Sequence, residues 1–198
     1  MKTNITIKFT EPMLGTKPSN KEIFGDWVAS KAPDGDKRKE ELDSAEHAEE
    51  GGTTVFARDN GEPGIYDYQI KGFFKDACAA LNRSDSEFRD KMEKLSAYKT
   101  KIDQCIFVYP RFIKFTIPEG SSISMLERPL RADTPQGPRI ALARSEIVPV
   151  GTTISFELQV LSKDLQRWVQ LCLDYGKMRG IGQWRNASYG RFTWSQIE

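Results

Sequence analysis

Regular alternation of apolar and polar residues at positions 152–161 is the feature that most constrains the fold. Its apolar members are Ile154, Phe156, Leu158 and Val160. Because successive side chains of a β-strand point to opposite faces, this period of two places all four on one face. Residues 5–9 show the same pattern. Each of the two strands therefore has an apolar face that has to be buried against a second layer of structure.

Two longer segments have the 3.6-residue period of amphipathic helices. Residues 68–81 carry apolar side chains at helical spacing, and Asp67 stands where an N-cap residue is expected. Residues 163–177 form a second segment of this kind. We also expect a more charged helix over residues 87–101 and a short one over residues 21–31. The sequence thus contains enough amphipathic helix to cover one face of a sheet.

Short extended segments separate these helices. Further strands are expected at residues 53–57, 105–109, 112–117, 140–147 and 191–194. The dipeptide Asn60-Gly61 favours a hairpin turn. The order strand, helix, strands, strand, helix, strand fits an α+β fold with a ferredoxin-like (RRM-like) core, in which two helices cover one face of an antiparallel sheet. Since 198 residues suffice for one well-buried core, we expect a single domain over residues 1–198.

The residue composition argues against several classes of site. His47 is the only histidine and lies in a Glu-rich stretch, so a catalytic triad or a two-histidine metal centre is not expected. The wide separation of Cys78, Cys105 and Cys172 favours buried free thiols over a zinc site or disulfides. No segment approaches the roughly 20 apolar residues of a membrane helix, and residues 1–9 contain no signal-peptide core. We therefore expect a cytoplasmic protein that has no metal, cofactor or membrane contact.

Charge is unevenly distributed along the chain. The formal net charge is +1, but residues 34–50 contain eight acidic and three basic residues. Residues 32–52, which end in Gly51-Gly52, are expected to form a mobile, solvated acidic insertion. Residues 175–192 contain four basic residues and no acidic one. Local positive charge of this kind favours contact with a phosphodiester chain.

The segment 180–191 combines several features that suit single-stranded RNA. Glycines permit tight turns, arginines can pair with phosphates, and aromatic rings offer stacking surfaces for bases. The candidate residues are Gly180, Gly182, Trp184, Arg185, Tyr189, Gly190 and Arg191. A helix-to-strand loop that needs glycine for its turn is the alternative interpretation, and the arginines and aromatic residues favour RNA contact.

Two further places are candidate contacts. Lys71 lies near a helix N-terminus, where a cation is unfavourable unless an anion binds beside it, and Gly72 would allow a phosphate to approach closely. A solvated lysine on a core-packed helix is an equally good interpretation. Residues 118–138 form a long loop rich in Pro, Gly, Ser and Arg, in which Arg128 and Arg131 could track an RNA backbone. A flexible surface loop without a role is the alternative there.

Three short motifs occur in an order that resembles the RAMP superfamily, specifically the backbone subunits of class 1 CRISPR effector complexes. They are Ile70-Lys71-Gly72, the run Glu-Ile-Val-Pro-Val-Gly-Thr at residues 146–152, and the Gly-rich loop at residues 180–190. The resemblance covers most of the chain. It implies a ferredoxin-like palm that binds a guide RNA and assembles along it with copies of itself and with other subunits of a ribonucleoprotein.

The resemblance also implies roles for individual residues. In the family, the Lys-Gly step (here Lys71-Gly72) and the Gly-rich loop contact the guide RNA. A protruding thumb kinks the guide, and residues 118–138 are its counterpart here. In the branch that cuts target RNA, an aspartate of an early loop is catalytic, and Asp26 is the residue that aligns with it.

The sequence departs from the family pattern in several places. The family has Pro-Gly-Ser-Ser before the Lys-Gly step, whereas residues 66–69 are Tyr-Asp-Tyr-Gln. The Gly-rich loop ends in Tyr189-Gly190 instead of Gly-x-Gly, and Asp26 lies in an expected helix. Three functions are therefore compared: a non-catalytic guide-RNA-binding subunit, a virus-borne mimic of such a subunit that acts as an anti-CRISPR or adaptor protein, and a metal-dependent RNA endonuclease that uses Asp26.

Overall fold

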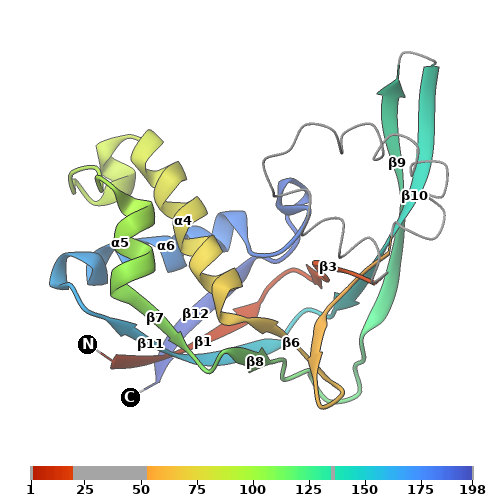
Figure 1. Ribbon diagram of the computed structural model, residues 1–198, viewed down its shortest axis with the longest axis horizontal. Helices are drawn as coiled ribbons and strands as arrows, with labels where there is room; N and C mark the ends of the chain where they lie inside the picture. The colour runs from red at the N-terminus through yellow and green to blue at the C-terminus, as the bar shows by residue number, and fades with distance from the viewer. Residues whose placement is uncertain (1, 20–52, 135–136, 198) are drawn as a thin grey trace, which may run out of the picture. The chain divides into compact units, whose positions relative to one another are not determined.

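The computed structural model describes residues 2–19, 53–134 and 137–197 (Figure 1). It divides into two compact units, each built from separate stretches of the chain. Unit 1 consists of residues 1–13, 57–122 and 148–198, and unit 2 of residues 14–56 and 123–147. The expected short helix at residues 21–31 and the acidic insertion at residues 32–52 lie outside the described residues. The expectation of a single domain stays a prediction.

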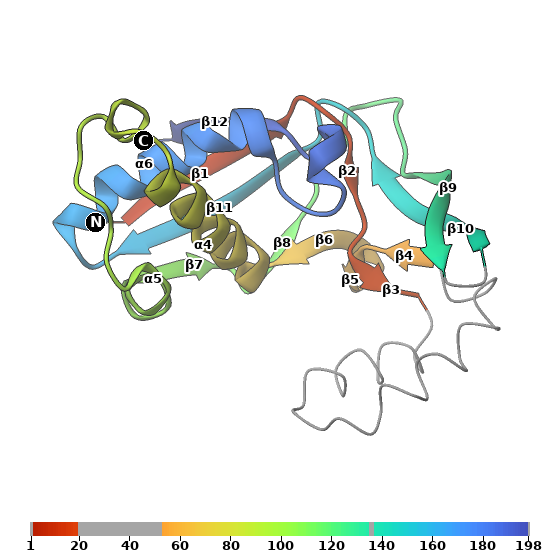
Figure 2. The ribbon, with the colours of Figure 1, turned by 90° about the horizontal axis from the view of Figure 1, so that it is seen from above.

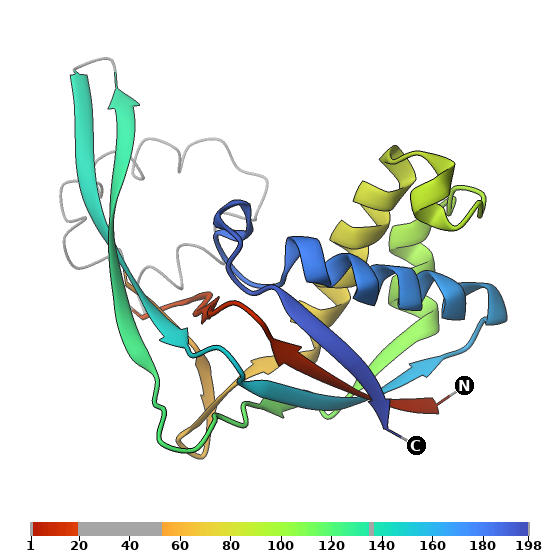
Figure 3. The ribbon, with the colours of Figure 1, turned by 180° about the vertical axis from the view of Figure 1, so that it is seen from behind.

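Unit 1 contains a four-stranded antiparallel sheet with the order β12-β1-β11-β7. Its strands are β1 (Lys2–Phe9), β7 (Ile106–Tyr109), β11 (Thr153–Val160) and β12 (Phe192–Ile197). Helices α4 (Asp67–Arg83) and α6 (Lys163–Arg179) both lie on one face of this sheet (Figures 2 and 3). The chain order β1, α4, β7, β11, α6, β12 is that of a ferredoxin-like fold, so the predicted α+β architecture is confirmed.

The core of unit 1 lies between the sheet and the two helices. Ile5 pairs with Phe156 and Ile7 with Ile154, and all four side chains are buried, as their alternation predicts. Burial of each large apolar side chain stabilises the fold by about 1.5–3 kcal/mol. On the helix side, the buried residues of α4 repeat at helical spacing: Ile70, Phe73, Phe74, Ala77, Cys78 and Leu81.

The start of α4 differs from the prediction in one detail. The N-cap position is occupied by Tyr66, and Asp67 is the first helical residue. The backbone N–H of Tyr66 donates to Oε1 of Gln69 at 2.9 Å, while Oδ1 of Asp67 accepts from the N–H of Tyr68 at 2.8 Å. Asp67 still supplies a negative charge in the first turn, where it interacts favourably with the helix dipole.

Unit 1 also contains a three-stranded sheet with the order β5-β6-β8. These strands are β5 (Ala57–Asp59), β6 (Glu62–Tyr66) and β8 (Phe112–Lys114). Asn60 and Gly61 join β5 to β6 with φ angles of 50° and 83°. Two positive φ angles are typical of the hairpin turn that Asn-Gly favours, so this prediction is confirmed.

The expectation of a helix over residues 87–101 is wrong. A 3-10 turn, η3 (Ser86–Arg89), is followed by irregular chain, and α5 begins later (Tyr98–Cys105). The guanidinium of Arg89 is buried and donates to the carbonyl oxygens of Leu81 and Ser84. The many charged residues of this segment suggested a helix, but the hydrogen bonds of the buried Arg89 hold the chain in a turn.

Unit 2 is dominated by a long hairpin of β9 (Ser124–Thr134) and β10 (Gly137–Val148). The sheet continues through β4 (Thr53–Val55) to β3 (Lys17–Pro18), and β2 (Met13–Leu14) lies on the other side of β10.

The expectation of a loop over residues 118–138 is therefore wrong for residues 124–134 and 137–138. Backbone pairing runs in continuous register from Ser124 with Ile147 to Thr134 with Gly137. In the described part of the chain β9 pairs with β10 alone, and an edge strand of this kind tolerates Pro129, which has no N–H to donate. Composition pointed to a loop because Pro, Gly, Ser and Arg are typical of turns, whereas the pairing that forms this hairpin is made by backbone groups.

Candidate nucleic-acid interface

Two glycines close the ends of the Gly-rich loop against each other. Gly180 follows α6 with φ 75°, and Gly190 has φ 73°, a region that L-residues with side chains rarely adopt. The N–H of Ile181 donates to the carbonyl of Gly190 at 2.9 Å. A Cβ atom on Gly190 would lie 1.9 Å from the Ile181 carbonyl oxygen. Both glycines are buried, so the structure gives them a role in loop closure.

Between these glycines the loop presents a stacked aromatic pair. The rings of Trp184 and Tyr189 have centroids 5.2 Å apart and planes inclined by 10°. They lie on either side of a short 3-10 turn, η4 (Arg185–Ala187). Trp184 is 42% exposed, so part of its ring faces solvent. A flat, partly exposed aromatic surface is suited to stacking a nucleobase of any identity.

The arginines of this region converge on a carboxylate from helix α4. Nη1 of Arg185 donates to Oδ2 of Asp76 at 2.6 Å, and Nε of Arg179 lies 3.7 Å from the same oxygen. Arg179 also donates through Nη1 to Oδ1 of Asn186 at 2.6 Å. The two guanidiniums and the carboxylate together carry a net charge of +1. The loop itself contains no acidic residue, but Asp76 of α4 supplies a negative charge that partly cancels the positive charge of its arginines.

Arg191 occupies the position where the loop enters β12. Its carbonyl oxygen accepts the N–H groups of Thr10 at 2.9 Å and Glu11 at 3.3 Å. Its Nε is buried and has no hydrogen-bond partner among the described residues. A buried donor without a partner costs about 1–3 kcal/mol.

Helix α4 places the other predicted contacts on its surface. The Nζ of Lys71 lies 5.1 Å from the centroid of the Phe107 ring on β7, a cation–π arrangement. Gly72 is exposed, and a Cβ atom added there would meet no atom within 4 Å. Neither packing nor backbone conformation therefore requires glycine at this position, and the backbone is open to close approach.

The remaining predicted residues belong to unit 2 or lie outside the described residues. Arg128 and Arg131 belong to β9 in unit 2. Asp26 and His47 lie outside the described residues. Within the described ranges no three His, Cys, Asp or Glu side chains gather in a way that could hold a metal ion. The endonuclease interpretation of Asp26 stays a prediction.

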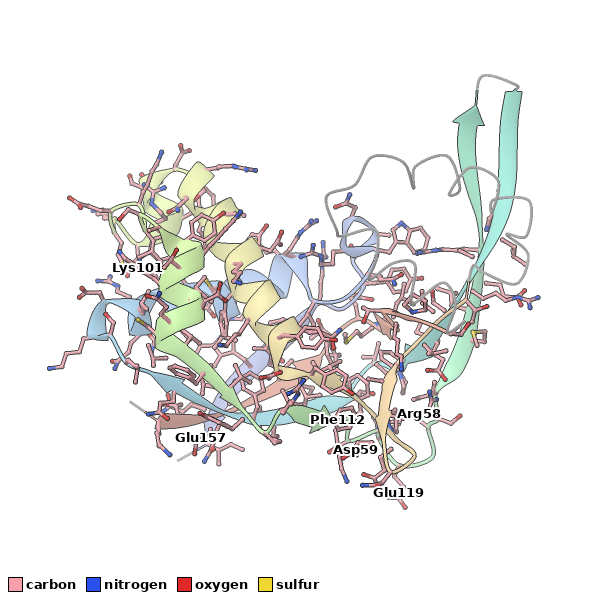
Figure 4. All side chains as sticks on the ribbon, viewed as in Figure 1. Arg58, Asp59, Lys101, Phe112, Glu119 and Glu157 are labelled. Carbon is pink, nitrogen blue, oxygen red and sulfur yellow. The ribbon has the colours of Figure 1, made fainter. Side chains whose placement is uncertain are left out.

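The open face of the four-stranded sheet differs from the stacking platform of RRM-type proteins. Its two central strands, β1 and β11, present short polar and charged residues on this face. The hydroxyl groups of Thr6 and Ser155 are 2.8 Å apart, and Nζ of Lys2 lies 3.3 Å from Glu157, which Figure 4 labels. An RRM stacks bases on aromatic residues of its sheet. The aromatic residues on this face are Phe107, which Lys71 covers, and Tyr109, and both belong to the edge strand β7, so the aromatic pair of the Gly-rich loop is the better candidate here.

Sequence inspection missed Asp76. It lies on α4, 109 residues before Arg185, and no local pattern connects the two.

In the described part of the chain, none of the helices has the length and the apolar run needed to span a bilayer.

Comparisons with known proteins found likeness only at the level of structure. No protein-family model and no curated protein matches the sequence. One similar solved structure is titled "Cryo-EM structure of the Type III-B Cmr-beta bound to cognate target RNA", with 12% identity and a TM-score of 0.49. The match covers 100% of this chain and 60% of that one. Another is titled "Type IV-B CRISPR Complex", with 10% identity and a TM-score of 0.48. That match covers 100% of this chain and 90% of the other chain.

Proposed function

We propose that the chain binds single-stranded RNA as a subunit of a CRISPR-type ribonucleoprotein and contacts the backbone of a guide RNA. The observation that carries this proposal is the combination, in one loop, of a stacked aromatic pair with clustered guanidiniums. Trp184 and Tyr189 supply the aromatic surface, Arg185 supplies donors for phosphate oxygens, and Arg191 adds a positive charge at the end of the loop. Stacking plus phosphate pairing is the chemistry of RNA binding without sequence preference.

Recognition in this arrangement depends on the shape and charge of the RNA strand. A base stacks on the exposed part of Trp184, which Tyr189 supports from the other side. Arg185 reaches an adjacent phosphate when it shares or gives up its contact with Asp76. Gly72 offers open backbone surface on α4, with Lys71 beside it. None of these contacts reads a base edge, which suits a subunit that accepts guides of any sequence.

The hairpin of unit 2 is the proposed counterpart of the thumb that kinks the guide. β9 carries Arg128 and Arg131, and its pairing with β10 makes it a regular two-stranded arm instead of a loop. Repeated binding of such subunits along one RNA would bring copies of the chain into contact. Partner subunits and a cytoplasmic location follow from the same proposal.

One observation favours a second candidate, a protein-binding mimic or adaptor related to such subunits. Several cations of unit 1 are paired with carboxylates: Arg185 with Asp76, Lys75 with Asp103, and Lys177 with Asp174. Paired cations contribute less to RNA affinity than solvent-exposed ones. A mimic would bind a protein partner and would carry no RNA of its own.

Purification of the intact protein separates the two candidates. A subunit is expected to carry RNA of defined length, seen as a raised absorbance ratio at 260 and 280 nm, in a large particle that ribonuclease dissolves. Affinity for a labelled oligoribonucleotide should fall steeply with salt, because phosphate pairing releases counterions. A nucleic-acid-free monomer that binds no oligoribonucleotide would contradict the proposal and favour the mimic.

Substitutions assign the binding to the loop. Arg185→Ala should weaken RNA binding across sequences alike, by about five- to tenfold for the loss of one charged contact. Arg167→Ala is the matched control, because Arg167 is also an arginine of unit 1 that pairs with an aspartate, Asp90. Equal affinity in wild type and both variants would exclude the loop as the RNA-binding surface.

A further inference from the structure

A second stacked aromatic pair lies at the start of helix α4. The rings of Tyr66 and Tyr68 have centroids 5.4 Å apart and planes inclined by 16°. Phe112, labelled in Figure 4, meets Tyr66 edge to face at 5.4 Å and 73°. Tyr68 is 60% exposed, whereas Tyr66 is half-buried. Tyr68 is thus the outer ring of a short stack whose inner members belong to the fold.

The backbone around this pair is held in place before any ligand binds. Tyr66 pairs with Phe112 in the β6–β8 ladder, and its N–H donates to Gln69 at 2.9 Å. The N–H of Asp67 donates to the carbonyl of Arg111 at 2.9 Å. A rigid platform loses little conformational entropy when a ligand stacks on it, which favours affinity.

Positive charge flanks the exposed ring. Desolvation is the main cause that raises the pKa of Tyr68, and the nearby Tyr66 and Asp67 add to it, whereas the positive charge of Arg111 lowers it. Arg111 is exposed, and its carbonyl oxygen accepts the N–H of Asp67 at 2.9 Å, which places it beside the start of α4. Lys71 lies three residues after Tyr68 and is its neighbour on the helix surface. The negative charge nearby, on Asp67, is engaged with the Tyr68 N–H.

We infer that Tyr68, supported by Tyr66, forms a second stacking site for a base of single-stranded RNA, with Arg111 placed to contact the neighbouring phosphate. This inference rests on the proposed function and adds to it a site that the Gly-rich loop does not include. The hydroxyl of Tyr68 is not needed for stacking, since the flat face of the ring makes the contact.

The course of helix α4 connects this site to the Gly-rich loop. Tyr68, Gly72 and Asp76 follow one another at four-residue spacing and so lie along one side of the helix. From Tyr68 to Asp76 the helix rises by about 12 Å. Gly72 lies between them with open space around its Cα, and Asp76 holds Arg185 of the loop. An RNA strand on Tyr68 that follows this side of the helix would pass over Gly72 and reach the loop at Arg185.

Binding of two matched oligomers tests the inference. One is a fluorescent oligouridylate, and the other is an abasic ribose-phosphate chain of the same length. Tyr68→Ala should weaken oligouridylate binding by about 5- to 100-fold, the effect of losing one stacked base, and should leave abasic binding unchanged. Tyr68→Phe should bind both oligomers like wild type. Tyr68→Leu should lose oligouridylate affinity like Tyr68→Ala, and unchanged abasic binding in both variants would show that the loss does not come from unfolding.

Phe88→Ala is the control for loss of an exposed aromatic ring. Phe88 is 64% exposed on η3 in the same unit, so its removal should not change binding. Oligouridylate affinity that is equal in wild type, Tyr68→Ala and Phe88→Ala would overturn the second site while leaving the Gly-rich loop as the RNA-binding surface. Wild-type protein that binds neither oligomer would overturn the proposed function itself.

Discussion

Arg185 in the Gly-rich loop donates a hydrogen bond to Asp76 on helix α4, with Nη1 and Oδ2 2.6 Å apart. Arg179, at the end of α6, approaches the same carboxylate oxygen at 3.7 Å. One acidic side chain therefore lies between two guanidiniums at the place where phosphate binding is proposed. It fixes the position of both arginines and also lowers the positive charge that they offer to RNA.

Neutralising this carboxylate should strengthen RNA binding. Asp76→Asn keeps a hydrogen-bond acceptor for Arg185 but raises the charge of the cluster by one. We expect about three- to fivefold tighter binding of an oligoribonucleotide, the range typical of one partly exposed ion pair. The dependence of log affinity on log salt should steepen by about 0.7 if one more phosphate is engaged. Fluorescence anisotropy over a series of salt concentrations measures both.

Asp103→Asn controls for the change in total charge. Asp103 also pairs with a cation of α4, Lys75, at 2.6 Å, but it takes no part in the Gly-rich loop. An equal gain from Asp76→Asn and Asp103→Asn would mean that only net charge matters. A loss of affinity in Asp76→Asn alone would show that the carboxylate acts mainly by positioning the arginines.

Alanine at two glycines should have opposite effects on stability. In Gly190→Ala the new methyl group clashes with the Ile181 carbonyl at a positive φ angle, so unfolding free energy should fall by at least about 2 kcal/mol. In Gly72→Ala the methyl group meets no atom within 4 Å, so helix propensity should stabilise the protein by about 0.5–1 kcal/mol. Chemical denaturation measures both changes.

RNA affinity of Gly72→Ala gives a second measurement on the same protein. If a phosphate approaches the backbone at Gly72, the methyl group should weaken RNA binding even though it stabilises the fold. Stability and affinity would then move in opposite directions. Unchanged affinity in a stabilised Gly72→Ala protein would remove this position from the proposed path of the RNA.

The thiols of Cys78 and Cys172 should resist alkylation in the native protein. Their sulfur atoms lie 3.4 Å apart between α4 and α6, and both side chains are buried. The hydrogen bond with Cys78, together with burial, raises the pKa of Cys172 well above its ordinary value, which suppresses the reactive thiolate. Iodoacetamide at pH 8, followed by mass spectrometry, should modify Cys105 first. Modification of Cys172 at the rate of Cys105 would contradict this packing.

The same pKa shift predicts a loss of stability at high pH. Above the ordinary thiol pKa of 9.0 the unfolded chain releases the Cys172 proton, while the native protein retains it. Because the native state then binds more protons, unfolding free energy falls as pH rises. Denaturation curves from pH 8 to 10.5 should show a smaller decline for Cys172→Ala than for wild type. Cys105→Ala should decline like wild type, and equal slopes in all three would refute the assignment.

Much of the fold follows from local sequence patterns. The period of two in β1 and β11 and the period of 3.6 in α4 and α6 predicted both element type and buried face, because each pattern is read within a few residues. The Asn60-Gly61 turn was predictable for the same reason. The order of these elements sufficed to indicate a ferredoxin-like arrangement, since few topologies bury all their apolar faces.

Within the candidate site, the sequence pointed to the residue types but not to their partners. It predicted that glycines, arginines and aromatic rings of the loop contact RNA, which stays a prediction, and the structure adds that Trp184 stacks on Tyr189. The same loop appeared free of negative charge, although Asp76 pairs with Arg185. The exposed stack of Tyr66 and Tyr68 was visible only as a departure from the family pattern.

What the sequence determined by itself is therefore the nature and order of the local elements, because hydrophobic period and turn chemistry act over neighbouring residues. The tertiary structure alone decided three other features: the turn around Arg89, the pairing of β9 with β10, and the contact of Arg185 with Asp76. Arg185 and Asp76 are 109 residues apart and meet only in the folded chain. The pairing of β9 with β10 and the turn around Arg89 join residues that are near in sequence, but they do so through backbone groups, which the pattern of side-chain types does not record. Hydrogen bonds and ion pairs between distant residues are set by the whole packed chain, and no local pattern records them.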